Sequence, residues 1–244
     1  MNRLKEIVLA VSLTAVLYSC KKEDVPAPGG NNDVIAPPAP FGFYVVGYFP
    51  SYRNLATVPD VKFRMCNVIN YAFATVSSTG SLSIANPTHL TDVRNKAKAN
   101  GCRVFISISG AAADFKSMAS SPAARTFFTN QAMNLVRTYA LDGVDVDWEF
   151  PRPDDGTDQT YTLLMKQLSD SCHLGRKYYL TAAITAGKYA GAVRDAISSE
   201  LWLGNYVDWF NIMSYDDFST TVPYKHHCDY NLATTSLNYW IGTR

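Results

Sequence analysis

Short runs rich in β-branched and aromatic residues alternate along this chain with longer segments of helical periodicity. Six of these runs are predicted as strands, and they cover residues 44–49, 66–74, 103–109, 143–150, 178–185 and 207–214. Because the runs are almost continuously apolar, we expect strands that are buried on both faces, in a parallel sheet covered by helices. Two architectures satisfy this pattern, the doubly wound sheet and the (β/α)8 barrel.

The segments between the runs carry helix start signals and apolar stripes. Asn86-Pro87 and Ser121-Pro122 each place a capping side chain before a proline at the first helical position. Two apolar stripes follow at helical spacing, one formed by Phe128, Ala132, Leu135, Val136 and Tyr139, the other by Tyr161, Leu164, Met165, Leu168 and Cys172. Gly175 predicts the end of the second striped helix, and residues 231–244 are predicted as a last helix.

The residues around the first run favour the barrel. Gly47-Tyr48-Phe49-Pro50 lacks the glycine-rich turn that binds phosphate after the first strand of a doubly wound nucleotide-binding sheet. We therefore predict an α/β fold, a (β/α)8 TIM barrel with its functional residues at the carboxyl ends of the strands. Only about six β/α units fit before Arg244. We expect a barrel truncated after the sixth unit, poorly stable and weakly active as given. Closure of the barrel by another chain or a swapped element is the alternative.

The first forty residues are predicted to lie outside the folded domain. Arg3 and Lys5 precede an apolar run over residues 7–17, which is too short to span a bilayer and is typical of a signal peptide. Leu17-Tyr18-Ser19-Cys20 resembles a lipoprotein cleavage box, so residues 1–20 predict an extracytoplasmic lipoprotein anchored at the bacterial surface or outer membrane through Cys20. Ordinary secretion is the alternative. Residues 21–40 hold five of the 12 prolines and are predicted as a flexible linker before a domain spanning 41–244.

Cysteine spacing and net charge argue against several classes of function. The four remaining cysteines form no CxxC pair, so no zinc site is predicted, and Cys66 and Cys102 are expected as small core residues rather than as a disulfide. His226-His227-Cys228-Asp229 is expected to be a loop, because adjacent ligands point apart. With 22 Lys+Arg against 21 Asp+Glu, the chain has no charge excess that would favour nucleic acid. We predict no metal and no cofactor.

Three carboxylates lie on one face of the fourth predicted strand. Strand alternation sends Asp145, Asp147 and Glu149 to one face, about 7 Å apart, and Val144, Val146 and Trp148 to the other. Inside a barrel, burial and mutual repulsion raise at least one carboxyl pKa, which is how a general acid is made. A polar face of a half-exposed strand and a divalent-metal site are the alternatives that the spacing leaves open.

The same segment resembles the DGxDxDxE signature of glycoside hydrolase family 18, the chitinases and their relatives. It reads Asp142-Gly143-x-Asp145-x-Asp147-x-Glu149 in this chain. Further segments resemble the family's motifs in the same order: residues 46–50 for its first strand, 70–73 for its second, 107–110 for its SxGG motif and 211–216 for its MxYD motif. The resemblance covers most of the chain from Tyr44 to about Gly242.

The resemblance implies a role for each matching residue. Glu149 is expected as the proton donor, Asp147 as the residue that orients the substrate's acetamido group, Asp145 as the carboxyl that shares a proton with Asp147, and Tyr215 as the donor to the acetamido carbonyl. Met213, Asp216, Tyr48 and Phe73 are expected to line the sugar subsite. Because the family uses the acetamido oxygen as its nucleophile, the expected chemistry is substrate-assisted and retaining, an exception to the two-carboxylate scheme.

Three functions remain open on these grounds. The first is a chitinase that cleaves β-1,4 linkages between N-acetylglucosamine residues of chitin or its oligomers. The second is an endo-β-N-acetylglucosaminidase that acts on N-linked glycans with the same chemistry. The third is a non-catalytic, lectin-like barrel that binds chitin. The presence of Glu149 argues against the third, and the aromatic Gly47-Tyr48-Phe49-Pro50 segment favours the first by resemblance.

Overall fold

The computed structural model of this chain describes residues 41–187 and 195–242. The predicted signal peptide with Cys20 and the predicted linker over residues 21–40 lie outside the described residues, so lipidation and localisation stay predictions. Within the described ranges, no helix is both long enough and apolar enough to cross a membrane.

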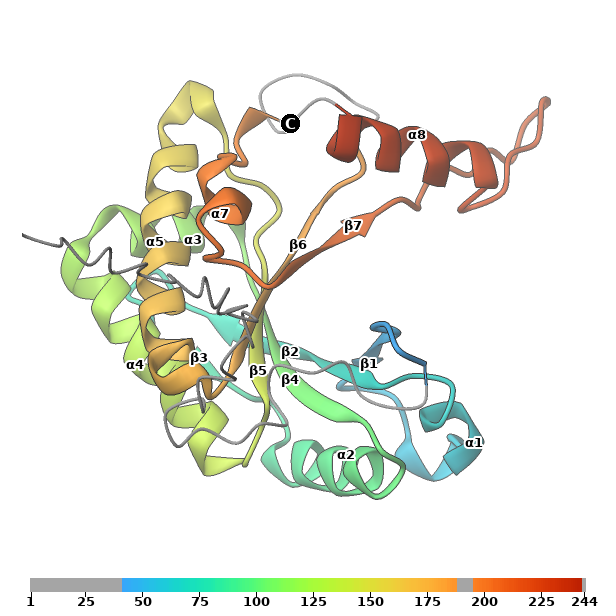
Figure 1. Cartoon of the computed structure of the whole chain (residues 1–244), viewed down its shortest axis with the longest axis horizontal. Helices are drawn as coiled ribbons and strands as arrows, with labels where there is room; N and C mark the ends of the chain where they lie inside the picture. Colours follow the sequence, from blue (N-terminus) through green and yellow to red (C-terminus); the bar gives the residue numbers. More distant parts are fainter. Residues whose placement is uncertain (1–40, 188–194, 243–244) are drawn as a thin grey trace, which may run out of the picture.

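One curved sheet carries the whole arrangement (Figure 1). Its six parallel strands lie in the order β1 (Val46–Pro50), β2 (Val68–Val76), β4 (Arg103–Ser109), β5 (Gly143–Asp147), β6 (Tyr179–Thr185) and β7 (Trp209–Met213). Each of these strands pairs with the next parallel strand along the chain, as in a (β/α)8 barrel. In the described part of the chain β1 and β7 form the two edges of the sheet. The predicted fold class is thus confirmed as part of such a barrel.

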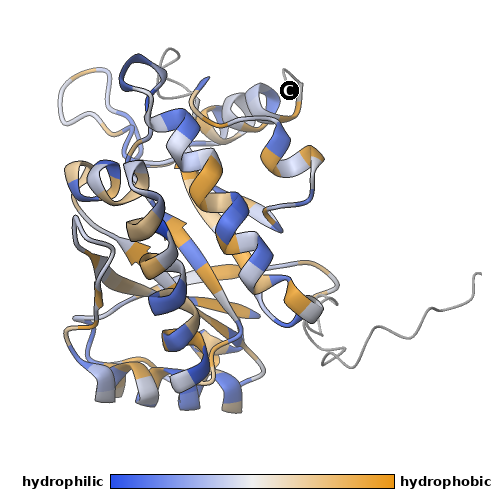
Figure 2. Ribbon diagram, turned by 90° about the vertical axis from the view of Figure 1, so that its left-hand side faces the viewer, coloured by the Kyte–Doolittle hydropathy of each residue, from blue (hydrophilic) through white to orange (hydrophobic). Residues whose placement is uncertain are grey.

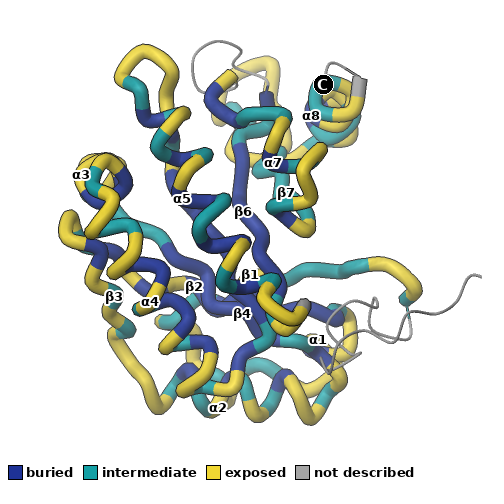
Figure 3. Tube along the Cα trace, turned by 60° about the vertical axis from the view of Figure 1, so that its left-hand side comes forward, coloured by how far each residue is buried: buried dark blue, intermediate teal, exposed yellow. Residues whose placement is uncertain are grey.

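Helices cover the outer face of this sheet (Figure 1). They are α1 (Asp60–Phe63), α2 (Pro87–Ala99), α3 (Ala112–Ser120), α4 (Pro122–Thr138), α5 (Thr157–Cys172), α7 (Glu200–Leu203) and α8 (Tyr230–Gly242). The central strands β2, β4, β5 and β6 are mostly buried and the edge strands β1 and β7 are mostly intermediate, whereas the outward turns of the helices are exposed (Figure 3). Hydrophobic residues are concentrated on the strands and alternate with hydrophilic ones around the helices (Figure 2). The main core therefore lies between the sheet and its helical layer.

The helix signals of the sequence are confirmed at both prolines. α2 begins at Pro87, where the Asn86 side chain accepts the His89 N–H at 3.0 Å. α4 begins at Pro122 behind Ser121, whose hydroxyl caps the first turn. The predicted stripe on α5 is buried along its whole length, and on α4 three of the five predicted residues are buried and the other two pack partly against the core. After α5, Gly175 has a φ of +68°, a left-handed conformation that favours glycine.

Five of the six parallel strands differ from the prediction by one to three residues at one or both ends, and two of these differences have an identifiable cause. The predicted strand over residues 143–150 ends at Asp147, so Glu149 lies beyond the hydrogen-bonded ladder. The second strand extends to Val76 because a two-residue antiparallel strand, β3 (Leu82–Ser83), pairs with its end. Neither feature has a periodic signal, since a two-residue strand is too short to show alternation and the end of a ladder depends on its neighbours.

Candidate active site

The alternation of β5 places its carboxylates on the inner face of the sheet. Val144 and Val146 are fully buried on the helix-facing side, and Trp148 stacks on Phe115 at 5.0 Å between ring centroids. The predicted core position of Trp148 is thereby confirmed. Asp145 and Asp147 are also buried, but on the opposite face. The burial of the apolar set by the helices therefore forces the carboxylates inward.

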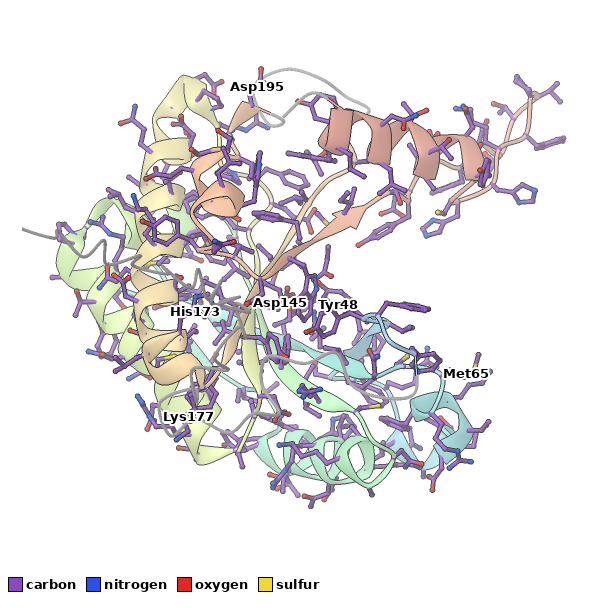
Figure 4. All side chains as sticks on the ribbon, in the orientation of Figure 1. Tyr48, Met65, Asp145, His173, Lys177 and Asp195 are labelled. Atoms are coloured by element: carbon purple, nitrogen blue, oxygen red, sulfur yellow. The ribbon has the colours of Figure 1, made fainter. Side chains whose placement is uncertain are left out.

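Asp145 lies at the centre of a hydrogen-bond network that joins four other strands. Its Oδ2 accepts the Tyr48 hydroxyl at 2.8 Å and the Ser107 hydroxyl at 2.7 Å, while its Oδ1 accepts Thr181 Oγ1 at 2.6 Å and Asn211 Nδ2 at 3.1 Å. Figure 4 shows Asp145 and Tyr48 side by side at the middle of the curved sheet. Burial raises the pKa of Asp145, and these hydrogen bonds oppose that rise.

Asp147 is the next inward residue, and it differs from Asp145 in having a free oxygen. Its Oδ1 is buried without a hydrogen-bond partner. Burial, followed by the charges of Glu149 and Asp145, raises the pKa of Asp147 to about 7. A buried acceptor of this kind is costly unless a ligand supplies a donor. The geometry therefore provides a position where a substrate N–H or O–H would be bound.

Glu149 lies exposed at the end of this row of carboxylates. Partial burial, and then the negative charge of Asp216, raises the pKa of Glu149 above its usual range. A carboxyl that reaches solvent and holds its proton more tightly than usual is suited to proton donation. The arrangement agrees with the role expected for Glu149, which stays a prediction.

The segment after β7 brings two further predicted residues to the carboxylates. Burial, and then the charges of Asp147 and Glu149, raises the pKa of the half-exposed Tyr215 to about 12. Asp216 follows it with a φ of +59°, a backbone conformation that few residues other than glycine adopt. Both residues therefore belong to the same electrostatic environment as Glu149, although they follow the edge strand β7, which is separated from β5 by β6.

A cavity of about 460 Å³ opens between the edge strands β1 and β7 and the helix α8, and none of the three carboxylates lines it. Tyr48, Met213 and Tyr215 are among its lining residues, so two of the four predicted subsite residues, Tyr48 and Met213, border it directly. Phe73 is partly exposed at a bulge, where the pairing between β2 and β4 skips a residue, and does not line this cavity.

Three of the residues that donate hydrogen bonds to Asp145 were not predicted from the sequence as site residues. Ser107 on β4 and Thr181 on β6 lie opposite Asp145 in the two neighbouring strands, and Asn211 comes from β7. Asn211 also donates to the Tyr48 hydroxyl at 3.1 Å. The sequence signal that could have identified these three residues is a polar residue within an apolar strand run, because such a residue requires a buried hydrogen-bond partner. Which partner it meets depends on the register between strands.

No metal centre is found in the described residues, where no group of three or more His, Cys, Asp or Glu side chains could hold an ion. The segment His226–Asp229 lies in the connection between β7 and α8, as predicted for a loop. All four cysteines of the described ranges are free thiols; Cys102 is buried and Cys66 half-buried against the core.

Replacing Asp147 by asparagine is expected to make stability less dependent on pH. The folded pKa of about 7 exceeds the ordinary 3.8, so the folded state holds this proton more tightly. Stability is lost as pH rises from about 4 to 7, by an amount on the order of 2–4 kcal/mol. Thermal denaturation of both proteins at pH 4, 6 and 8 should show Asp147→Asn gaining on wild type as pH rises. A constant difference would contradict the raised pKa.

The sequence matches a family model over nearly all of the described domain. This model, "Glycosyl hydrolases family 18", covers residues 44–243. Chitinase A1 of Niallia circulans is 37% identical over 117 residues, which cover 42% of this chain and 16% of that protein. Probable chitinase 10 of Drosophila melanogaster is 26% identical over 215 residues, which cover 76% of this chain and 9% of that protein. The chain thus spans a small part of these curated relatives.

Solved structures resemble the fold as well. A chitinase from Bacteroides thetaiotaomicron superimposes with a TM-score of 0.67 at 22% identity, covering 81% of this chain and 61% of that one. A GH18 chitinase from Cycas revoluta in complex with (GlcNAc)3 superimposes with a TM-score of 0.68 at 20% identity, covering 82% of this chain and 65% of that one. At this level of identity the likeness shows the fold alone.

Proposed function

The chain belongs to family 18 of the glycosyl hydrolases, and from this premise we propose that it cleaves β-1,4 linkages between N-acetylglucosamine units of chitin or its oligomers, with Glu149 as the proton donor. The relatives named chitinases and the (GlcNAc)3 complex of the Cycas revoluta enzyme support the substrate class.

One observation supports the proposal most strongly, namely the difference between neighbouring carboxylates on β5. Asp145 has its acceptors filled by neutral donors, Asp147 keeps a buried oxygen free, and Glu149 reaches solvent. A substrate with an acetamido group offers an N–H for the free oxygen of Asp147. The same sugar would place its glycosidic oxygen near the exposed acid. Because most buried acceptors in folded proteins are hydrogen-bonded, the free oxygen of Asp147 favours a ligand-binding role over a purely structural one.

The proposed reaction uses the substrate's own acetamido oxygen as nucleophile. Glu149 donates its proton to the glycosidic oxygen while the acetamido oxygen bonds to the anomeric carbon, so the glycosidic bond breaks and an oxazolinium ion forms. Asp147 accepts the acetamido N–H and stabilises the positive charge. The Tyr215 hydroxyl donates to the acetamido oxygen and orients it. Water then attacks the anomeric carbon, its bond to the acetamido oxygen breaks to restore the acetamido group, and the water proton passes to Glu149, with net retention of configuration.

Asp145 has a positioning role in this scheme. Because Tyr48, Ser107, Thr181 and Asn211 all donate to it, Asp145 is held by neutral dipoles. Its charge contributes to the raised pKa of Asp147. An oxazolinium ion would offset that repulsion, so Asp147 is expected to interact more strongly with the intermediate than with the neutral substrate.

The test is product analysis with the full-length protein. Chitohexaose should be shortened, and NMR of the first products should show the β-anomer, while an N-glycan carrying a chitobiose core should remain intact. Cleavage of the N-glycan alone would replace the proposal by an endo-β-N-acetylglucosaminidase. Binding of chitohexaose without any cleavage by the folded protein would replace it by a lectin-like function. Initial appearance of the α-anomer would overturn the retaining mechanism.

A further inference from the structure

The connection between β7 and α8 folds back on itself and returns to the residues that directly follow β7. The Asp217 N–H donates to the His227 carbonyl at 3.1 Å, and Ser219 pairs with Lys225 in an antiparallel bridge. Lys225 Nζ also lies 3.3 Å from Asp217 Oδ2. These contacts define a hairpin over residues 217–227. Its closing end places His227 next to the residues that directly follow β7.

His227 contacts both predicted site residues of that segment. Its ring stacks on Tyr215 with 5.7 Å between centroids and 23° between planes. Its Nδ1 lies 3.2 Å from Asp216 Oδ1, which is an ion-pair distance when the imidazole is protonated. His226, the preceding residue, has neither contact among those of the described chain. The His227 side chain thus contacts two consecutive residues, Tyr215 through the face of its ring and Asp216 through Nδ1 at the ring edge.

The Asp216 backbone beside His227 is strained, and the Asp216 charge acts on Glu149. Asp216 adopts a φ of +59°, which costs energy for a residue with a side chain and persists only where surrounding contacts hold it. Burial and then the Asp216 charge raise the pKa of Glu149, and burial and then the charges of Asp147 and Glu149 raise the pKa of Tyr215. A small displacement of residues 215–216 would therefore move the Tyr215 hydroxyl and the Asp216 charge, both of which act at the reaction site around Glu149.

We propose that His227 is a positioning residue for the proposed glycosidase reaction, holding Tyr215 by ring stacking and Asp216 by its Nδ1 contact. The inference rests on the proposed function, because only a reaction at Glu149 gives these two positions a catalytic meaning. His227 itself is largely exposed, with 61% of its side chain open to solvent, and Asp216 is 73% exposed. Exposed pairs contribute little to global stability, so the effect of His227 should be local.

Kinetics of three variants separate the two contacts. His227→Ala should lower kcat for chitohexaose roughly tenfold with little change in KM, since misplacing an orienting group affects the transition state. His227→Phe keeps the ring and should retain most of kcat. It removes the Nδ1 contact with Asp216, whose charge then acts more strongly on Glu149, and the alkaline limb of kcat/KM should move to higher pH. His227→Gln keeps a donor without a ring and should lose kcat with an unchanged limb.

His226→Ala is the matched control, because it removes the neighbouring imidazole from the same hairpin. It should keep the wild-type kcat and pH profile. The charged groups near the contact include Asp217 and Lys225, which pair with each other, and Glu149 across the site. A His227→Ala protein with wild-type kcat, or one that matches His226→Ala in every parameter, would overturn the proposal.

Hydrogen exchange gives a second readout that does not require turnover. In His227→Ala, amides of residues 214–218 should exchange faster than in wild type or His226→Ala, while those of β4 and β5 stay unchanged. If the wild-type protein does not hydrolyse any substrate, the proposed function fails, and this measurement still decides whether His227 holds the segment. Unchanged exchange at residues 214–218 would show that it does not.

Discussion

A Glu149→Gln variant is expected to lose at least about a thousandfold in kcat on chito-oligosaccharides. The amide has nearly the size of the carboxyl but has no acidic proton, so the glycosidic oxygen leaves unprotonated. Glu149 lies exposed beyond the end of β5, and no hydrogen bond from it supports the described fold. The variant should therefore fold as wild type does and bind chitohexaose with a similar dissociation constant, as measured by calorimetry.

A matched control for this change is Glu200→Gln on α7. Glu200 pairs with Lys166 on α5, away from the carboxylates, and its substitution introduces the same amide at a surface position. Full activity in Glu200→Gln beside lost activity in Glu149→Gln would assign the loss to the site. Retention of more than a tenth of wild-type kcat by Glu149→Gln would show that another group supplies the proton.

The second large effect is expected on stability, from Asp145→Leu. Leucine fills the space but accepts no hydrogen bond, and it leaves two fully buried hydroxyls, those of Ser107 and Thr181, without their acceptor. Each buried group left unsatisfied costs about 1–3 kcal/mol, so the loss of the acceptor for these two hydroxyls should lower the free energy of unfolding by about 2–6 kcal/mol. Urea denaturation followed by circular dichroism measures this change.

Asp170→Leu provides the comparison, since it makes the same substitution at an exposed position of α5. It should change the free energy of unfolding by less than about 0.5 kcal/mol. Asp145→Asn should fall between the two, because its remaining carbonyl oxygen can still accept from two donors. Equal stability of Asp145→Leu and Asp170→Leu would mean that the network around Asp145 contributes nothing to folding.

Much of this architecture could be predicted from local sequence. The apolar runs located all six parallel strands, and Asn86-Pro87 and Ser121-Pro122 located two helix starts to the residue. The two-residue period of β5 assigned Val144 and Val146 to the core and the aspartates to the inner face. These features are readable because strand alternation and helix capping depend on residues within a few positions of one another.

The sequence alone thus determined the fold class, the carboxylate row and the family resemblance. How these carboxylates differ in hydrogen bonding, burial and pKa follows from the tertiary structure. The four donors to Asp145 come from positions 36 to 97 residues away, and which of them meet depends on the register between strands. The pKa of Asp147 and the contact of His227 with Tyr215 arise in the same way. Burial, electrostatic interactions and side-chain contacts depend on residues that are neighbours in space, so no short-range periodicity of the sequence predicts them.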